Sequence, residues 1–193
     1  KQLEAAEHFI FMEYFNVDEG IMWGRVLYIH AAKAAAGVDV RFMYDGSCEF
    51  ALLPHDYPRR LRKLGIKCKV FAPVSPFVST HYNYRDHRKI LVIDGHTAFN
   101  GGVNLADEYI NQKAKFGHWK DTAVMLKGEA VKSFTLMFLQ MWEIDEAEEE
   151  SARFLSFPAA PEEAAGGYVI PYGDCPLDNE KLGERVYIDI LNR

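Results

Sequence analysis

A charged cluster, an apolar run of strand length and a turn signal follow one another in Asp86-His87-Arg88-Lys89-Ile90-Leu91-Val92-Ile93-Asp94-Gly95. The apolar run predicts a buried strand over residues 87–93. Asp94-Gly95 is a strong hairpin signal, which predicts a second strand over residues 97–99. Because side chains alternate along a strand, His87 and Lys89 are expected on one face and Arg88 on the other.

Strand and helix patterns alternate on both sides of this hairpin. Strands are predicted over residues 8–15, 38–44, 67–71 and 122–126, and helices over residues 20–36, 56–64 and 129–144, with the end of another helix at 1–7. The strand–helix–strand order at the start is typical of a parallel pair in an α/β sheet. The predicted fold class is therefore α/β, with a mixed sheet flanked by helices on both faces.

Composition changes after the helix predicted at 129–144. Residues 145–150 are almost all acidic, which favours a solvated helix end over a binding tail, and residues 158–167 are rich in Pro, Ala, Glu and Gly. We therefore predict a first repeat over residues 1–146 and a linker over 147–167. Residues 168–193 are expected to open a second repeat, with a strand at 168–170 and a helix at 184–193.

Overall composition excludes several classes of protein. A length of 193 residues suits one substantial domain, and the formal charge of −6 argues against a dedicated nucleic-acid binder. No apolar run approaches the roughly 18 residues that span a bilayer. Cys48, Cys68 and Cys175 form no CxxC pair, so we expect ordinary reduced thiols and no metal site.

His87 and Lys89 carry the clearest chemical signal. A buried ammonium group is costly unless it is paired, and an anion held between the two side chains would supply the partner. Phosphate fits, because His87 could attack phosphorus while Lys89 neutralises the non-bridging oxygens. Taken alone, the triplet is better explained by a surface strand. The later segment Gly101-Gly102-Val103-Asn104 adds a close backbone approach and a neutral donor.

Together these residues match the pattern HxKxxxxDxxxxxxGGxN at each fixed position, and the chain is similar to the phospholipase D superfamily. Its surroundings resemble the first half of a bacterial cardiolipin synthase. The resemblance covers nearly the whole chain and rests on Phe11 to Phe15, Tyr84 to Lys89, Gly101 to Tyr109, His118 to Asp121 and Pro171 to Asp174.

The resemblance implies a role for each motif residue. His87 would form a phosphohistidine intermediate or act as its acid–base partner, and the phosphate would be bound by Lys89, Asn104 and Gly102. Asp94 matches the motif aspartate, although its place in the turn favours a structural hydrogen bond. Asp121 would orient His87, and Glu13 is a weaker candidate for the same pocket. The remaining histidines that we considered are expected to lie in loops: His81, His96 and His118.

The resemblance also implies a reaction without a cofactor or metal. Two phosphatidylglycerol molecules would give cardiolipin and glycerol; a hydrolase, a nuclease and a non-catalytic half-domain are the alternatives. The superfamily builds one site from two such motifs, and this chain has one. Either a homodimer completes the site or a second repeat of a longer chain does, and residues 168–193 favour the longer chain. We expect missing N-terminal segments to anchor the full-length protein in the cell membrane, and the fragment itself to be soluble.

Overall fold

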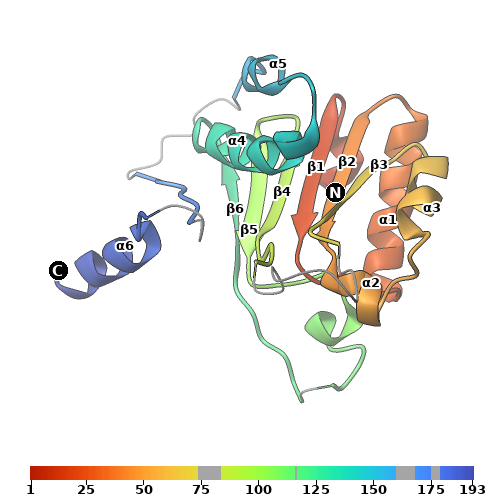
Figure 1. Ribbon diagram of the computed structural model, residues 1–193, viewed down its shortest axis with the longest axis horizontal. Coiled ribbons are helices and arrows are strands. Elements are labelled where there is room, and N and C mark those ends of the chain that lie inside the picture. Colours follow the sequence, from red (N-terminus) through yellow and green to blue (C-terminus); the bar gives the residue numbers. More distant parts are fainter. Residues whose placement is uncertain (74–83, 116, 160–167, 175–178) are drawn as a thin grey trace.

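The computed structural model describes residues 1–73, 84–115, 117–159, 168–174 and 179–193, and a six-stranded mixed sheet forms its centre (Figure 1). The strands are β1 (Phe9–Tyr14), β2 (Asp39–Asp45), β3 (Lys67–Phe71), β4 (Lys89–Ile93), β5 (Thr97–Gly101) and β6 (Ala123–Lys127). Their order is β3-β2-β1-β4-β5-β6. The first three are parallel, whereas β4 is antiparallel to β1 and the later strands continue antiparallel.

Helices cover both faces of the sheet, which confirms the predicted fold class (Figure 1). The helices are α1 (Ile21–Ala35), α2 (Ser47–Ala51), α3 (Tyr57–Lys63), α4 (Ala130–Trp142), α5 (Ser151–Leu155) and α6 (Leu182–Leu191), with short 3-10 helices at Leu3–Ala5, Asp107–Ile110 and Glu143–Asp145. On one face, Trp23 of α1 packs against Phe42. On the other, Phe138 of α4 stacks on Phe11, with ring centroids 4.7 Å apart. Alternation along each strand supplies both cores.

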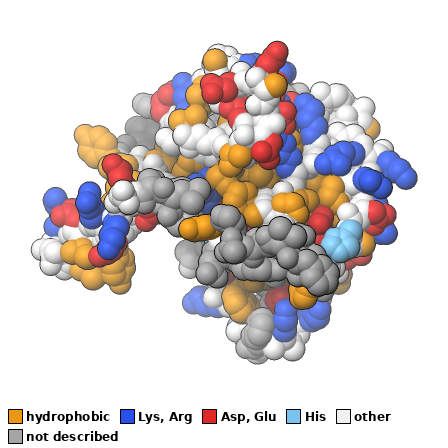
Figure 2. Space-filling view, viewed as in Figure 1, with side chains coloured by type: hydrophobic (Ala, Val, Ile, Leu, Met, Phe, Trp, Pro, Cys, Tyr) orange, Lys and Arg blue, Asp and Glu red, His pale blue; other side chains and the backbone are white. Residues whose placement is uncertain are grey.

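The C-terminal region departs from its prediction in one respect. The helix is present as α6, but residues 168–170 form no strand. No residue of α6 is buried, and Figure 2 shows hydrophobic side chains gathered on this helix, away from the sheet. They include Tyr187, Ile188 and Leu191, which are 64%, 48% and 68% exposed. A strand at 168–170 would need a neighbouring strand, and the described part of the chain offers none beside it.

Some residues that follow the predicted boundary at residue 146 pack against the first folded unit. Phe154 of α5 is 2% exposed and packs edge-on against Phe9 and Phe11. Only the later part of the segment 147–167 remains a candidate for a linker. Residues 160–167 of that part lie outside the described residues. The apolar contacts of Phe154 explain why the first folded unit extends beyond residue 146.

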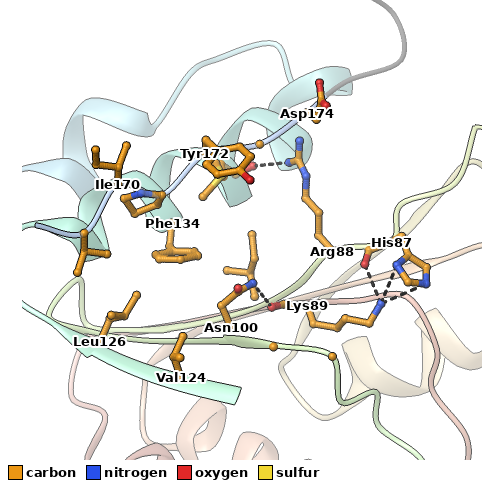
Figure 3. A pocket seen from close by; sticks show the side chains of 17 residues that line it. His87, Arg88, Lys89, Asn100, Val124, Leu126, Phe134, Ile170, Tyr172 and Asp174 are labelled. Atoms are coloured by element: carbon orange, nitrogen blue, oxygen red, sulfur yellow. Dashed lines mark hydrogen bonds between the residues drawn. The ribbon is translucent and has the colours of Figure 1, made fainter. Parts of the chain in front are cut away.

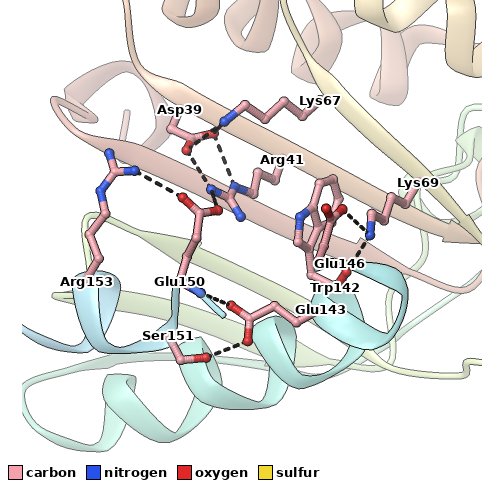
Figure 4. Close-up of polar contacts among 10 residues, drawn as sticks. All are labelled: Asp39, Arg41, Lys67, Lys69, Trp142, Glu143, Glu146, Glu150, Ser151 and Arg153. Carbon is pink, nitrogen blue, oxygen red and sulfur yellow. Dashed lines mark hydrogen bonds and ion pairs between the residues drawn. The ribbon is translucent and has the colours of Figure 1, made fainter. Parts of the chain in front are cut away.

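A buried arginine links this extension to the sheet (Figure 4). Arg41 of β2 is 1% exposed and forms ion pairs with Asp39 at 2.9 Å and Glu150 at 2.6 Å. Its guanidinium also lies 4.7 Å from the centre of the Phe154 ring. Glu146 pairs with Lys69 in the same region. The acidic run 145–150 is therefore partly engaged with β2 and β3, and is more than a solvated helix end.

Two further sequence expectations concern thiols and membrane spans. Cys48 and Cys68 are buried free thiols, and burial raises their pKa to about 11 and about 12. Cys175 and His81 lie outside the described residues. Among the helices that the structure describes, none is long and apolar enough to span a membrane.

The turn between β4 and β5 is tied to the start of β1. Asp94 and Gly95 adopt φ angles of 52° and 70°, as a type I′ hairpin turn requires. The Asp94 carboxylate accepts three backbone hydrogen bonds, from Glu7 at 2.7 Å, His8 at 2.8 Å and Phe9 at 2.7 Å. The Asp94 N–H donates to the Phe9 carbonyl. This carboxylate therefore holds the N-terminal segment against the hairpin.

Replacing Asp94 by asparagine should destabilise the fold. Oδ1 accepts from His8 and Phe9, whereas Oδ2 accepts from Glu7, so an amide NH₂ in either place would face a donor. We expect Asp94→Asn to lower the free energy of unfolding by about 2–3 kcal/mol, measured by urea denaturation. Asp189→Asn, which breaks an exposed pair on α6, should change it by less than about 0.5 kcal/mol. Equal losses in the two variants would contradict the structural role.

Candidate active site

His87 and Lys89 meet at the start of β4 (Figure 3). Lys89 Nζ lies 3.1 Å from His87 Nδ1 and donates to the His87 carbonyl at 2.7 Å. Lys89 is 5% exposed, whereas His87 is open to solvent. The Phe15 ring, directly after β1, lies 4.6 Å from the His87 ring and 5.4 Å from Lys89 Nζ. The predicted pair is thus brought together, with an aromatic side chain against both members.

The surroundings of the pair favour an uncharged imidazole. Burial lowers the pKa of His87, and the positive charge of Lys89 lowers it further, against the opposing effect of Asp86. Burial likewise lowers the pKa of Lys89, while the charges of Asp86 and Asp121 oppose this. A neutral imidazole has a free lone pair, which a nucleophile requires.

Asn104 is held by the loop that follows β1. Its Oδ1 accepts the Asn16 N–H at 3.1 Å, and its Nδ2 donates to the Tyr109 hydroxyl at 2.9 Å. A bridge between Val17 and Leu105 joins the two loops. An amide nitrogen carries two hydrogens, and among the described residues only one N–H of Asn104 has a partner.

Asp107, three residues after Asn104, caps α1 from a distance. Its carboxylate accepts the N–H groups of Ile21 at 3.0 Å and Met22 at 2.8 Å. These bonds, that of Met22 first, lower the pKa of Asp107. A Cβ at Gly20 would lie 2.6 Å from this carboxylate, which explains the glycine. The second half of the motif is therefore fixed to α1 as well as to β5.

Gly102 differs from its expected role. Its N–H donates to the Thr122 carbonyl at 3.2 Å, so it is already used and is not free to bind phosphate. A Cβ at this position would lie 2.3 Å from Asp121 Oδ1. The glycine is required because the Asp121 carboxylate approaches so closely.

Asp121 lies beside Gly102 without a hydrogen bond to His87 among the described residues. Its carboxylate accepts from Trp119 Nε1 at 3.1 Å and from the Thr122 N–H at 2.7 Å. Through its charge it also raises the pKa of Lys89. In this structure Asp121 is therefore a neighbour of Lys89 more than an orienting partner of His87.

Asp94 is not part of the site. The whole of β4 separates it from His87, a distance of about 20 Å at the usual rise per strand residue. His96 lies beside Asp94 at that far end, with Nε2 3.9 Å from the carboxylate. His118 is exposed in the loop before β6. In the described part of the chain, no three His, Cys, Asp or Glu side chains are grouped to hold a metal ion.

A cavity of about 770 Å³ opens next to the pair, on the α4 face of the sheet. One end is polar and is lined by His87, Arg88, Lys89 and Asn100, and the other is apolar (Figure 3). The apolar wall comes from Val124, Leu126, Phe134, Met137, Val169 and Ile170. Residues 169–174 thus line the cavity as an extended segment. The sequence analysis missed Arg88 and this segment as site components, although Arg88 stands within the motif.

A buried carboxyl pair lies under the polar end. Glu13 is 0% exposed and neither of its oxygens has a conventional hydrogen-bond donor, while Arg88 Nη1 is 3.9 Å away. Burial raises the pKa of Glu13 well above its usual range, and the charge of Asp86 raises it further. Burial also raises the pKa of Asp86. Burial and mutual repulsion thus favour the protonated form of this carboxyl pair, and of Glu13 most strongly.

The raised pKa of Glu13 has a consequence for the pH dependence of stability. In the unfolded chain Glu13 ionises above about pH 4.5. Above that pH, folding is therefore coupled to the uptake of a proton by Glu13, which costs free energy. Its contribution is therefore complete below that pH and is lost as the pH rises toward the raised folded pKa. We expect Glu13→Gln to gain stability relative to the parent over this window, by up to about 1.4 kcal/mol per pH unit.

Urea denaturation between pH 4 and pH 8 would measure this difference. Glu184→Gln, on the exposed helix α6, is the control and should follow the parent at every pH. Parallel profiles for Glu13→Gln and the parent would show that Glu13 is ionised in the folded protein.

Comparison with known proteins agrees with this geometry. Residues 2–142 match the family model described as the phospholipase D-like domain of cardiolipin synthase. The chain is 63% identical over all 193 residues to an uncharacterized protein of Streptococcus mutans serotype c, and spans 42% of it. It is 40% identical over 168 residues, 86% of its length, to a cardiolipin synthase of Geobacillus thermodenitrificans, and spans 33% of that protein.

A solved structure shares the fold. The phospholipase D family member Nuc from Salmonella typhimurium matches 74% of this chain and 82% of its own, with a TM-score of 0.57 at 16% identity. The Streptococcus and Geobacillus relatives are much longer than this chain, which spans less than half of each. The motif, the sheet and the family model lead to one conclusion: the chain belongs to the family of phospholipase D-like domains of cardiolipin synthases.

Proposed function

We propose that this chain is one half of a cardiolipin synthase, which transfers a phosphatidyl group between two phosphatidylglycerol molecules and releases glycerol. No cofactor enters this reaction. The observation that best supports a lipid substrate is the cavity beside His87 and Lys89, which has a polar end and an apolar wall. A phospholipid has the same division between an anionic phosphodiester and a hydrocarbon portion, and an apolar wall stabilises the hydrocarbon by burial.

The reaction proceeds in two displacements. A nitrogen of the neutral His87 ring attacks phosphorus, and the bond from phosphorus to the head-group glycerol breaks. The departing glycerol oxygen takes a proton from a second histidine. That histidine then removes the proton from a hydroxyl of the second phosphatidylglycerol, whose oxygen attacks phosphorus and breaks the bond to His87. Each step forms one bond to phosphorus and breaks one.

Three side chains support this chemistry in our proposal. Lys89, 3.1 Å from the His87 ring, balances the negative charge on the phosphate oxygens. The remaining N–H of Asn104 binds one of those oxygens. Asp121 keeps Lys89 charged through its own negative charge, and it would turn toward His87 when the imidazole becomes cationic. Asp94 acts on the fold alone.

In our proposal the second histidine comes from another repeat. This chain has one motif, and it spans 42% and 33% of two longer relatives, which leaves room for a second repeat in each. We propose that residues 168–193 lead into that repeat and that other segments of the full-length protein hold it at the cell membrane. A second copy of this chain is the alternative source of the histidine.

Two other activities use the same intermediate. Water in place of the second lipid would make the protein a hydrolase, and a nucleic-acid phosphodiester in place of the lipid would make it a nuclease. The net charge of −6 and the apolar wall of the cavity disfavour a nucleic acid. A non-catalytic half-domain is disfavoured by the contact of His87 with Lys89.

Replacing His87 by alanine in the full-length protein should remove phosphatidyl transfer, because the phosphorus would have no nucleophile. We expect a loss of at least about a thousandfold, measured as cardiolipin formed from phosphatidylglycerol vesicles and resolved by thin-layer chromatography. The melting temperature should change little, since His87 is exposed. His55→Ala, on an exposed histidine 82% accessible in its side chain, is the matched control and should retain activity. Phosphatidic acid as the sole product of the parent would identify a hydrolase instead.

The isolated chain should fold but form little or no cardiolipin, because a single histidine cannot both attack phosphorus and protonate the leaving group. Size-exclusion chromatography combined with the same lipid assay tests this. The exposed apolar side chains of α6 favour weak self-association. A stable dimer with full activity would show that the second histidine comes from a second copy of the chain and not from a second repeat.

A further inference from the structure

Arg88 lines the cavity but has no part in the two displacements at His87. It lies between His87 and Lys89 in sequence, and its side chain points to the opposite face of β4, toward α4 (Figure 3). Its Nη1 donates to the Met137 carbonyl of α4 at 3.2 Å. A guanidinium has five N–H donors, and this is its only hydrogen bond to the described residues. The side chain is 26% exposed, so the other donors remain accessible from the cavity.

Among the described residues, no carboxylate lies within hydrogen-bonding distance of the Arg88 guanidinium. The nearest carboxyl is that of Glu13, at 3.9 Å, which is fully buried and whose pKa burial raises well above its usual range. Asp86 uses Oδ1 to accept the backbone N–H of Arg88 at 3.1 Å, so it faces the backbone of this residue. The guanidinium therefore presents a cation to a cavity whose lining also includes Asp174 and whose far end is apolar.

An anion in such a cavity needs a cation of its own. An unpaired phosphate beside apolar side chains would lose its hydration without compensation. Lys89 is already committed to the phosphate that reacts at His87. Cardiolipin synthesis, however, brings two phosphodiesters into one site, since the acceptor lipid keeps its own phosphate throughout the reaction.

We propose that Arg88 binds the intact phosphodiester of the acceptor phosphatidylglycerol, so that the two faces of β4 hold the two phosphates of the product. This inference rests on the proposed function and adds the acceptor subsite to it. A planar guanidinium matches two phosphate oxygens at once. The glycerol unit of the acceptor then spans from this subsite to the phosphorus on His87. Arg88 selects an anionic acceptor over water or a neutral alcohol.

A competition between acceptors tests this selection. The full-length protein receives phosphatidylglycerol vesicles containing 1-butanol, and the ratio of cardiolipin to phosphatidylbutanol is measured in one reaction. Both products come from the same phosphatidyl-enzyme, so this ratio does not depend on how much protein is folded. We expect Arg88→Gln to lower the ratio about tenfold or more, while phosphatidylbutanol formation continues. Lys132→Gln removes one positive charge from the surface of α4, where Lys132 pairs with Glu129, and should leave the ratio unchanged.

Each remaining outcome decides the proposal. An unchanged ratio in Arg88→Gln, or an equal fall in Lys132→Gln, overturns it. If Arg88→Gln forms neither product, Arg88→Lys decides, because lysine keeps the charge but loses the planar fork: the ratio must fall about threefold, and an unchanged ratio overturns the proposal. A parent that forms phosphatidylbutanol but no cardiolipin refutes both the acceptor subsite and the synthase activity, and leaves the phosphatidyl transfer at His87 intact. A parent that forms neither refutes the proposed function itself.

Discussion

The antiparallel pairing of β1 with β4 is the constraint on which the rest of this structure depends. It joins a parallel half, built from strand–helix–strand units, to an antiparallel half, built from a hairpin. Its register places Glu13 opposite Ile90 and Tyr14 opposite Lys89. At the far end, the Asp94 carboxylate holds the amides that lead into β1. A shift of one residue would turn every side chain of β4 to the wrong face. The apolar cores on both sides of the sheet therefore stabilise this register.

The same register gives the site its electrostatic character. Because Glu13 faces α4 in a fully buried position, its pKa is raised, and Arg88 beside it keeps an accessible positive charge. Lys89, on the other face, is drawn toward His87 and keeps the imidazole neutral. One strand thus separates two cations that would repel each other on a single face. Two anionic groups can approach from different sides, as the joining of two phospholipids requires.

Much of the fold could be predicted from local patterns, and the failures have physical causes. Strands and helices up to residue 144 follow from apolar periodicity, and the Asp94-Gly95 turn follows from the φ angles that these two residues tolerate. The packing of Phe154 could not be predicted from composition, because the segment around it is polar overall and the burial of one aromatic side chain depends on its distant partners. The role expected for Gly102 differs from the observed one because the sequence does not show whether a glycine makes room for a ligand or for a neighbouring carboxylate, here that of Asp121.

The sequence by itself determined the family, the strand that begins at Lys89, and the placement of His87 beside Lys89, because motif spacing and two-residue alternation are local properties. Only the tertiary structure decided which candidates meet. Asp94 belongs to the same motif yet lies a full strand length from His87, and Arg88 opens into a cavity completed by residues 169–174. The raised pKa of Glu13 likewise depends on its burial in the folded structure. Burial and long-range pairing depend on segments far apart in the chain, and no local pattern records them.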